Sequence, residues 1–190
     1  FLSWELELLP VYLLLAIWGG KNRQYAATKF IIYAAGSSIF ILLAALAMGF
    51  YGTGAPNFEF SHLANQDFGQ NFQILCYIGL LIAFGVKLPI VPLHTWLPDA
   101  HVQAPTAGSI LLAGVMLKMG LYGLMRAALP PLPIGAEFFV PLMVALAIVS
   151  ILYGAVLSLG QTDLKKLVAY SSVCLSYTSD AADETVRVDL

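Results

Sequence analysis

The sequence is short of charged residues and rich in apolar ones. Of its 190 residues, 11% are charged and 59% are hydrophobic, whereas soluble domains average about 25% charged and about 45–50% apolar residues. A water-soluble fold of this size could not hide so much apolar surface. The composition therefore predicts a protein whose solvent is the lipid bilayer.

Cysteines and the other usual elements of a redox centre are also scarce. The two cysteines, Cys76 and Cys174, lie far apart, and the sequence contains neither C-x-x-C nor G-x-G-x-x-G. Iron–sulfur clusters, structural zinc and c-type haem need clustered ligands, and dinucleotides favour the glycine fingerprint. We therefore expect no cofactor and no metal in this chain. The lack of a basic patch with interleaved aromatic residues also excludes nucleic acid as a partner.

Long apolar windows are what the sequence has in abundance. Windows of about 20 residues mark membrane spans; here they cover residues 1–18, 27–50, 72–93, 106–129 and 138–160, and a sixth begins at residue 167. The chain opens inside the first apolar run, without Met or a basic leader. We expect an all-α, polytopic transmembrane helical bundle cut from a longer protein, with about five spans and the start of a sixth.

Basic residues are unevenly distributed between the connections. Lys21, Arg23 and Lys29 flank the first connection and Lys165 and Lys166 the fifth, whereas the alternate connections hold a single basic residue. The positive-inside rule places the first, third and fifth connections on the cytoplasmic side, or on the equivalent side of an organelle.

The last stretch, residues 174–190, breaks the pattern. It contains four of the eleven acidic residues and no apolar span, although a helix has just begun before it. Its first eleven residues differ at one position from the translation of a transposon adapter used in sequencing libraries. We interpret residues 1–173 as the membrane domain and residues 174–190 as a non-homologous tail produced by a sequencing artefact.

Two lysines inside apolar spans are the strongest functional candidates. A lysine near mid-membrane costs about 2.5–3.5 kcal/mol by insertion scales, and such residues usually face a polar interior where they serve a function. Lys87 and Lys118 both fit, and Lys118 is the only charge between Asp99 and Arg126. The alternatives are snorkelling to an interface and a structural hydrogen bond.

Prolines predict a discontinuous helix near residues 87–92. Pro89 cannot donate to the Gly85 carbonyl, nor Pro92 to that of Leu88, so we expect freed carbonyls on both sides of Lys87. Transporters build polar sites from such broken helices. A simple proline kink is the alternative.

Acidic and imidazole side chains complete the set of candidates. Glu5 and Glu7 are two residues apart and point about 200° apart on a helix, so at most one faces a common partner, and spacing alone does not choose between them. His94 and His101 share a face only if the intervening segment is helical. Imidazole suits proton relay, with structural hydrogen bonding as the alternative.

These residues lie in strings that resemble a known family. FGVKLPIVPLHTWLPDAHVQAPTAGSILLAGVMLKMGLYGLMR is similar to the core of the antiporter-like subunits of respiratory complex I and its photosynthetic relative. The opening, FLSWELELLPVYLLLAIWGGK, resembles the chain 4 or M-type version, especially the photosynthetic one. The resemblance covers about residues 1–173.

The resemblance implies a role for each candidate. The family's essential glutamate, in W-E-L-x-L-x-P, falls on Glu5. Its broken-helix lysine falls on Lys87 and its central lysine on Lys118. The family's histidines fall on His94 and His101.

The resemblance implies a proton-translocating subunit of an NAD(P)H–quinone oxidoreductase in an energy-transducing membrane (bacterial plasma, thylakoid or mitochondrial inner membrane). Other membrane subunits would be its partners, and NAD(P)H, iron–sulfur clusters and quinone would bind in partner subunits. A cation/proton antiporter subunit or a membrane-bound hydrogenase subunit is the alternative, and a purely structural scaffold a more distant one. We also expect Glu5 and Lys87 to pair across adjacent helices, because an unpaired ion in an apolar span is costly.

Overall fold

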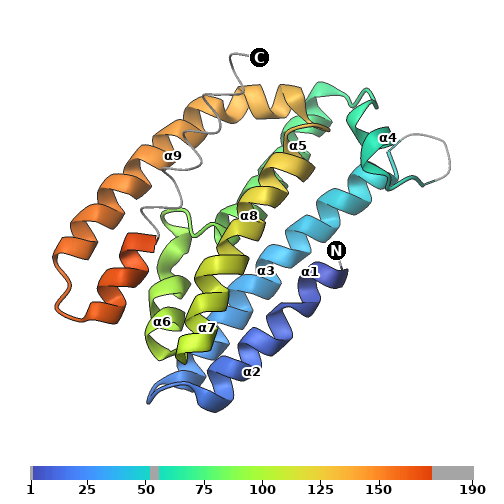
Figure 1. Ribbon diagram of the computed structural model, residues 1–190. Coiled ribbons are helices and arrows are strands. Elements are labelled where there is room, and N and C mark those ends of the chain that lie inside the picture. Colours follow the sequence, from blue (N-terminus) through green and yellow to red (C-terminus); the bar gives the residue numbers. More distant parts are fainter. Residues whose placement is uncertain (1, 52–55, 173–190) are drawn as a thin grey trace.

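The computed structural model describes residues 2–51 and 56–172, and this part of the chain is helical without any strand (Figure 1). The all-α prediction is confirmed. The predicted tail, residues 174–190, lies outside the described residues. The division at residue 173 therefore stays a prediction.

The helices follow the predicted apolar windows closely. In chain order they are α1 (Leu2–Leu6), α2 (Leu8–Trp18), α3 (Arg23–Gly49), α4 (Phe60–Ala64), α5 (Gln70–Lys87), α6 (Trp96–Gln103), α7 (Thr106–Leu111), α8 (Leu117–Gly123) and α9 (Pro133–Leu159). A 3-10 turn, η1 (Leu93–Thr95), precedes α6, and π-helical segments η2 (Leu112–Met116) and η3 (Leu124–Ala128) flank α8.

Four helical stretches of the described chain are long and apolar enough to cross a membrane: Arg23–Gly49, Gln70–Lys87, Thr106–Ala128 and Pro133–Leu159. The predicted first span consists of α1 and α2, which are separated at Glu7. The predicted sixth helix begins near residue 164. At its start, the Asp163 carbonyl accepts the Leu167 N–H, and the Asp163 carboxylate accepts the Lys165 N–H.

Helix α5 lies at the centre of the bundle. It packs against α3, α8 and α9, while α2 packs along the other side of α3 (Figure 1). The first and third connections meet: Gly20 N–H donates to the Gln103 carbonyl over 2.9 Å, and Asn22 N–H donates to the Gln103 side-chain oxygen over 3.2 Å. The fifth connection, after α9, lies at the same end of the bundle (Figure 1). The connections that carry most basic residues are therefore on one side.

The predicted break in the third span is present. Helix α5 ends at Lys87, and helical structure resumes only at Leu93. The expectation of a free Gly85 carbonyl is wrong, because the Ile90 N–H donates to it over 2.8 Å. The Trp96 indole likewise donates to the Val86 carbonyl over 2.8 Å. These bonds supply the partners that the interrupted helix would have lost, which is how broken helices are tolerated inside membrane proteins.

Candidate proton-transfer site

An ion pair between buried Lys87 and half-buried Glu5 forms where α5 ends. The Lys87 ammonium lies 3.7 Å from Glu5 Oε1 in α1, and the two side chains are 5% and 22% exposed. The predicted pairing of Glu5 with Lys87 is confirmed as geometry. Glu7 also attracts Lys87, but the pair within 4 Å is made by Glu5. The choice that helical spacing left open is thus decided in favour of Glu5.

Each charge of the pair has further support. The Lys87 ammonium lies 5.2 Å from the centre of the Trp4 ring, within the range of a cation–π interaction. Lys87 is also the last residue of α5, where the negative end of the helix dipole favours a cation. On the other side, the Ser38 hydroxyl of α3 donates to Glu5 Oε2 over 2.6 Å. Three segments therefore converge on the pair: α1, α3 and the end of α5.

Helix α8 approaches the pair through a glycine. A Cβ atom on Gly120 would lie 3.3 Å from Lys87 Cβ and 3.3 Å from the Leu88 backbone nitrogen. The absence of a side chain at Gly120 therefore lets α8 lie directly against the break. One turn on, a Cβ atom on Gly123 would lie 2.4 Å from the Phe84 ring and 2.9 Å from the Trp4 ring. These glycines set how closely α8 and α5 pack around the lysine.

Lys118 points away from the pair. It is exposed on α8, and it lies two residues before Gly120, which faces Lys87. Residues two apart on a helix point about 200° apart. Within the described chain, the expected interior position of Lys118 is therefore not seen. The π-helical segments on both sides of α8 are of a kind frequently found at functional sites.

The two histidines lie beyond the break. The segment from Leu93 to Gln103 is helical throughout, so His94 and His101, seven residues apart, lie about two turns apart on a shared face. Both are buried. The His94 ring contacts the Tyr153 ring edge-on, with 5.3 Å between the ring centres. Because α6 ends at Gln103, His101 lies near the basic end of the bundle and His94 lies deeper, toward Lys87.

Three of the five predicted site residues have a buried polar atom without a hydrogen-bond partner in the described part of the chain. These atoms are Glu5 Oε1, His94 Nδ1 and His101 Nε2. Buried polar atoms are nearly always hydrogen-bonded, and each exception needs an explanation. The Lys87 ammonium, 3.7 Å away, accounts for Glu5 Oε1, and imidazole nitrogens such as those of His94 and His101 can exchange a proton.

A second ion pair joins α3 to α6. The Lys29 ammonium donates to Asp99 Oδ2 over 2.6 Å, and Tyr33 and Thr95 share a hydrogen bond of 3.1 Å beside it. From the sequence, Lys29 was expected to flank the first connection. The structure instead places it inside α3, because that helix begins at Arg23. The Lys29 charge therefore holds α6, which follows the break, against α3, and it also adds to the positive charge at the end of the bundle where the basic connections lie.

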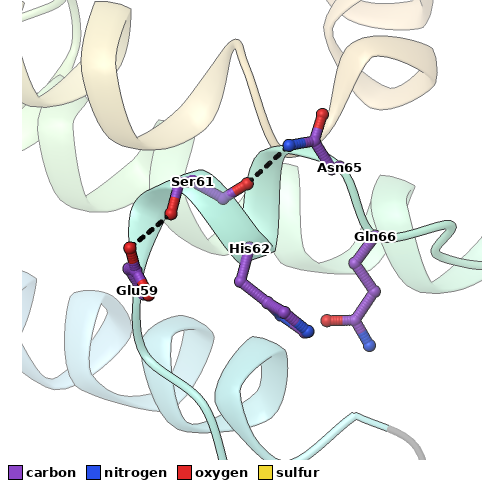
Figure 2. Close-up of a pocket in the computed structure, with 5 residues that line it drawn as sticks. All are labelled: Glu59, Ser61, His62, Asn65 and Gln66. Carbon is purple, nitrogen blue, oxygen red and sulfur yellow. Dashed lines mark hydrogen bonds between the residues drawn. The ribbon is translucent and has the colours of Figure 1, made fainter.

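A polar hollow lies at the other end of the bundle, on α4. Its lining is Glu59, Ser61, His62, Asn65 and Gln66 (Figure 2). Ser61 donates to Glu59 over 2.6 Å, and the Asn65 amide donates to the Ser61 carbonyl over 2.8 Å. His62, in α4, is exposed. None of the predicted site residues lines this hollow.

Comparison with known proteins decides the family. The family described as "NADH:quinone oxidoreductase/Mrp antiporter, TM" matches residues 1–175. The chain belongs to this family. The resemblance inferred from the sequence is confirmed, and the apolar helices are those of an integral membrane protein.

Two similar curated relatives carry the same name. "NAD(P)H-quinone oxidoreductase chain 4" of Prochlorococcus marinus subsp. pastoris is 75% identical over 173 residues, covering 91% of this chain and 32% of the relative. The protein of the same name from Synechococcus sp. is 66% identical over 173 residues, covering 91% of this chain and 31% of the relative. The chain thus spans about a third of the length of these relatives.

Solved structures show the same fold. A chain of "Respiratory complex I from Thermus thermophilus with bound NADH" has a TM-score of 0.85 and 30% identity, with 93% of this chain and 38% of the other covered. A chain of the archaeal membrane-bound sulfane sulfur reductase has a TM-score of 0.76 and 24% identity, with 93% and 36% covered. This second likeness concerns the fold alone.

Two contributors to the site, Ser38 and Trp4, could not be recognised in the sequence. Ser38 looks like an ordinary serine in an apolar helix, and nothing in the spacing indicates that it reaches Glu5. Trp4 precedes Glu5 directly, but only the fold brings its ring to Lys87. Gly120 and Gly123 did carry a usable pattern, because small residues on one face of a transmembrane helix mark close packing.

Proposed function

We propose that this chain is a proton-translocating part of chain 4 of an NAD(P)H–quinone oxidoreductase. In this proposal, quinone reduction in other subunits drives proton transfer through this chain. The residues that pass the protons are Glu5, Lys87, Lys118, His94 and His101. The observation that carries the proposal is the buried Glu5–Lys87 ion pair at the end of a broken helix. Ionisable groups inside membranes are costly and are typical of proton relays.

The first step concerns proton supply from the basic end of the bundle. His101 lies near that end and His94 lies about two turns deeper, toward the break. Each has a buried ring nitrogen without a hydrogen-bond partner among the described residues. Imidazole exchanges protons near neutral pH. The two rings are suited to receive a proton in turn and to release it toward Lys87 and Glu5.

The second step is electrostatic. At 3.7 Å, opposite charges attract by about 4.5 kcal/mol at an effective dielectric constant of about 20. A proton that binds Glu5 removes this attraction and leaves the Lys87 ammonium without its counter-charge. Lys87 then releases its proton onward. The proton on Glu5 next passes to the neutral Lys87 amine, which restores the ion pair and leaves Glu5 ready for the next proton. Lys118, on the far side of α8, would take the proton toward groups outside this chain.

Electron transfer belongs to the partner subunits in this proposal. NAD(P)H, iron–sulfur clusters and quinone would bind there. The described residues do not fit a metal cluster: Cys76 is buried in α5, and they contain no group of three or more His, Cys, Asp or Glu that could hold a metal ion. In the sequence, Cys174 is far from Cys76. No step of the proposed mechanism passes through such a group.

The family also includes Mrp antiporters. The names of the relatives favour the oxidoreductase, since proteins 66% and 75% identical to this chain are called NAD(P)H-quinone oxidoreductase chain 4. The same comparison supports membrane partners for this chain. We propose that the chain lies against other membrane subunits of the complex and against lipid.

A matched pair of substitutions tests the proposal. Glu5→Gln removes the charge that pairs with Lys87, whereas Glu7→Gln removes an equal charge two residues away. Both are made in the complete subunit, and proton uptake is measured in vesicles that contain the intact complex, with NAD(P)H and a short-chain quinone. We expect Glu5→Gln to abolish most of the uptake that depends on this subunit and Glu7→Gln to retain most of it. Normal uptake with Glu5→Gln would contradict the proposal.

A further inference from the structure

Two neighbouring serines of α3 share one backbone acceptor. Ser37 and Ser38 are both buried, and their hydroxyl oxygens lie 2.7 Å and 2.9 Å from the Ala34 carbonyl oxygen. Such bonds to a carbonyl one turn back are usual for serine inside a helix. Ser38 differs from Ser37 because its hydroxyl also lies 2.6 Å from Glu5 Oε2.

The Ser38 hydroxyl has two acceptors but only one proton. A serine hydroxyl donates one hydrogen bond at a time, so Ser38 serves either Glu5 or Ala34. The Ala34 carbonyl is shared with the Ser37 hydroxyl, and the charged carboxylate is the stronger acceptor for Ser38. The 2.6 Å distance falls in the range of a charge-assisted O–H···O⁻ bond. The geometry therefore favours donation to Glu5 while Glu5 is ionised.

We infer that Ser38 is a positioning residue for Glu5, whose hydroxyl turns between Glu5 and Ala34 as Glu5 loses or gains a proton. This inference rests on the proposed function, because it assumes that Glu5 carries protons. With Glu5 ionised, Ser38 holds Oε2 and directs Oε1 toward Lys87. Of the two oxygens, only Oε1 then has no hydrogen bond to the described residues.

The protonated state uses the same atoms with the bonds reversed. A proton that binds Oε2 makes the carboxyl a donor to Ser38 Oγ. The Ser38 O–H bond is not broken; it rotates toward the Ala34 carbonyl at 2.9 Å. The carboxyl gains one proton and every hydroxyl keeps its own. Because a hydrogen bond exists in both states, Glu5 stays in place beside Lys87 through the whole cycle, and neither state leaves a buried hydroxyl without a partner.

The experiment compares substitutions that separate hydrogen bonding from packing. Ser38→Ala removes the hydroxyl, Ser38→Cys nearly keeps its size but provides only a weak donor, and Ser38→Thr keeps the hydroxyl and adds a methyl group. In vesicles with equal amounts of assembled complex, we expect Ser38→Ala and Ser38→Cys to lower proton uptake per quinone reduced by about tenfold, in keeping with the loss of a hydrogen bond to a charged group. Ser38→Thr should retain most of the uptake.

Ser37→Ala is the matched control, because Ser37 is also buried and donates to the same Ala34 carbonyl, whereas the hydrogen bond to Glu5 comes from Ser38. We expect it to retain most of the uptake. Wild-type uptake with Ser38→Cys, or equal losses with Ser37→Ala and Ser38→Ala, would overturn the inference. Glu5→Gln in the same preparation separates the two proposals: a normal Glu5→Gln variant overturns both, whereas a defective Glu5→Gln with a normal Ser38→Ala overturns only the role of Ser38.

Discussion

Neutralising both members of the ion pair should do less harm to stability than neutralising either one. The relevant substitutions are Glu5→Leu and Lys87→Met. The charges lie 3.7 Å apart, and Lys87 is 5% exposed, so their attraction is about 4.5 kcal/mol at an effective dielectric constant of about 20. Desolvation of both ions offsets much of this attraction. Removing one partner leaves the other charge buried and unpaired, which costs about 3–5 kcal/mol.

The double variant leaves no charge and no polar atom of the pair behind. Ser38 loses Glu5 as an acceptor, but its hydroxyl can donate to the Ala34 carbonyl at 2.9 Å instead. Replacing a buried ion pair by apolar residues is often neutral or stabilising. We therefore expect each single variant to unfold several degrees below the wild type and the double variant to unfold close to it.

Thermal unfolding of the purified complex, followed through this subunit, provides the measurement. Proton uptake should be lost in all three variants, since none keeps the ionisable pair. If the effects of Glu5→Leu and Lys87→Met on the unfolding temperature simply add in the double variant, the two residues are not coupled. That result would refute the argument that the pair stabilises the site through mutual charge neutralisation.

Three further outcomes are expected, the first from the isolated charge of Lys118 in an apolar span and the other two from the structure and the distribution of basic residues. Lys118→Ala should abolish most proton uptake while the complex still assembles, which vesicle assays and the amount of purified complex check together. Gly120→Ala should lower proton uptake several-fold because its methyl group would press on Lys87 and the Leu88 backbone, whereas Gly114→Ala, which would meet no atom within 4 Å, should leave uptake normal. Cysteines introduced by Asn22→Cys and Asn57→Cys should react with an impermeant reagent from opposite sides of the membrane. The cysteine at position 22 should react from the side of the basic connections. Reaction of both cysteines from one side would contradict this topology.

Much of the fold was accessible from the sequence, because length and hydropathy decide where helices cross a bilayer. The prolines near Lys87 correctly predicted the break. They did not predict how the backbone carbonyls at the break are satisfied. The Ile90 N–H donates to the Gly85 carbonyl and the Trp96 indole to the Val86 carbonyl, and both contacts depend on how the chain folds back after α5. Nor did periodicity predict that α1 and α2 separate at Glu7.

The candidate site was predicted in part. An apolar surrounding makes a charge conspicuous, so Glu5 and Lys87 could be identified and paired on electrostatic grounds. Lys118 was expected in the interior for the same reason, but apolar flanks do not reveal which way a helix face turns. The sequence did not predict the roles of Ser38 and of the Lys29–Asp99 pair, because these roles depend on contacts between α3 and the distant segments α1 and α6.

The most direct test of the central claim is a charge exchange between Glu5 and Lys87. Glu5→Lys and Lys87→Glu are introduced singly and together in the complete subunit, and protons taken up per quinone reduced are measured in vesicles. Each single change places like charges together, whereas the double change restores opposite charges. Because the exchanged pair loses the Trp4 and Ser38 contacts, we expect partial uptake in the double variant and almost none in either single variant. A double variant no more active than the single variants would contradict the claim that this ion pair carries the proton transfer.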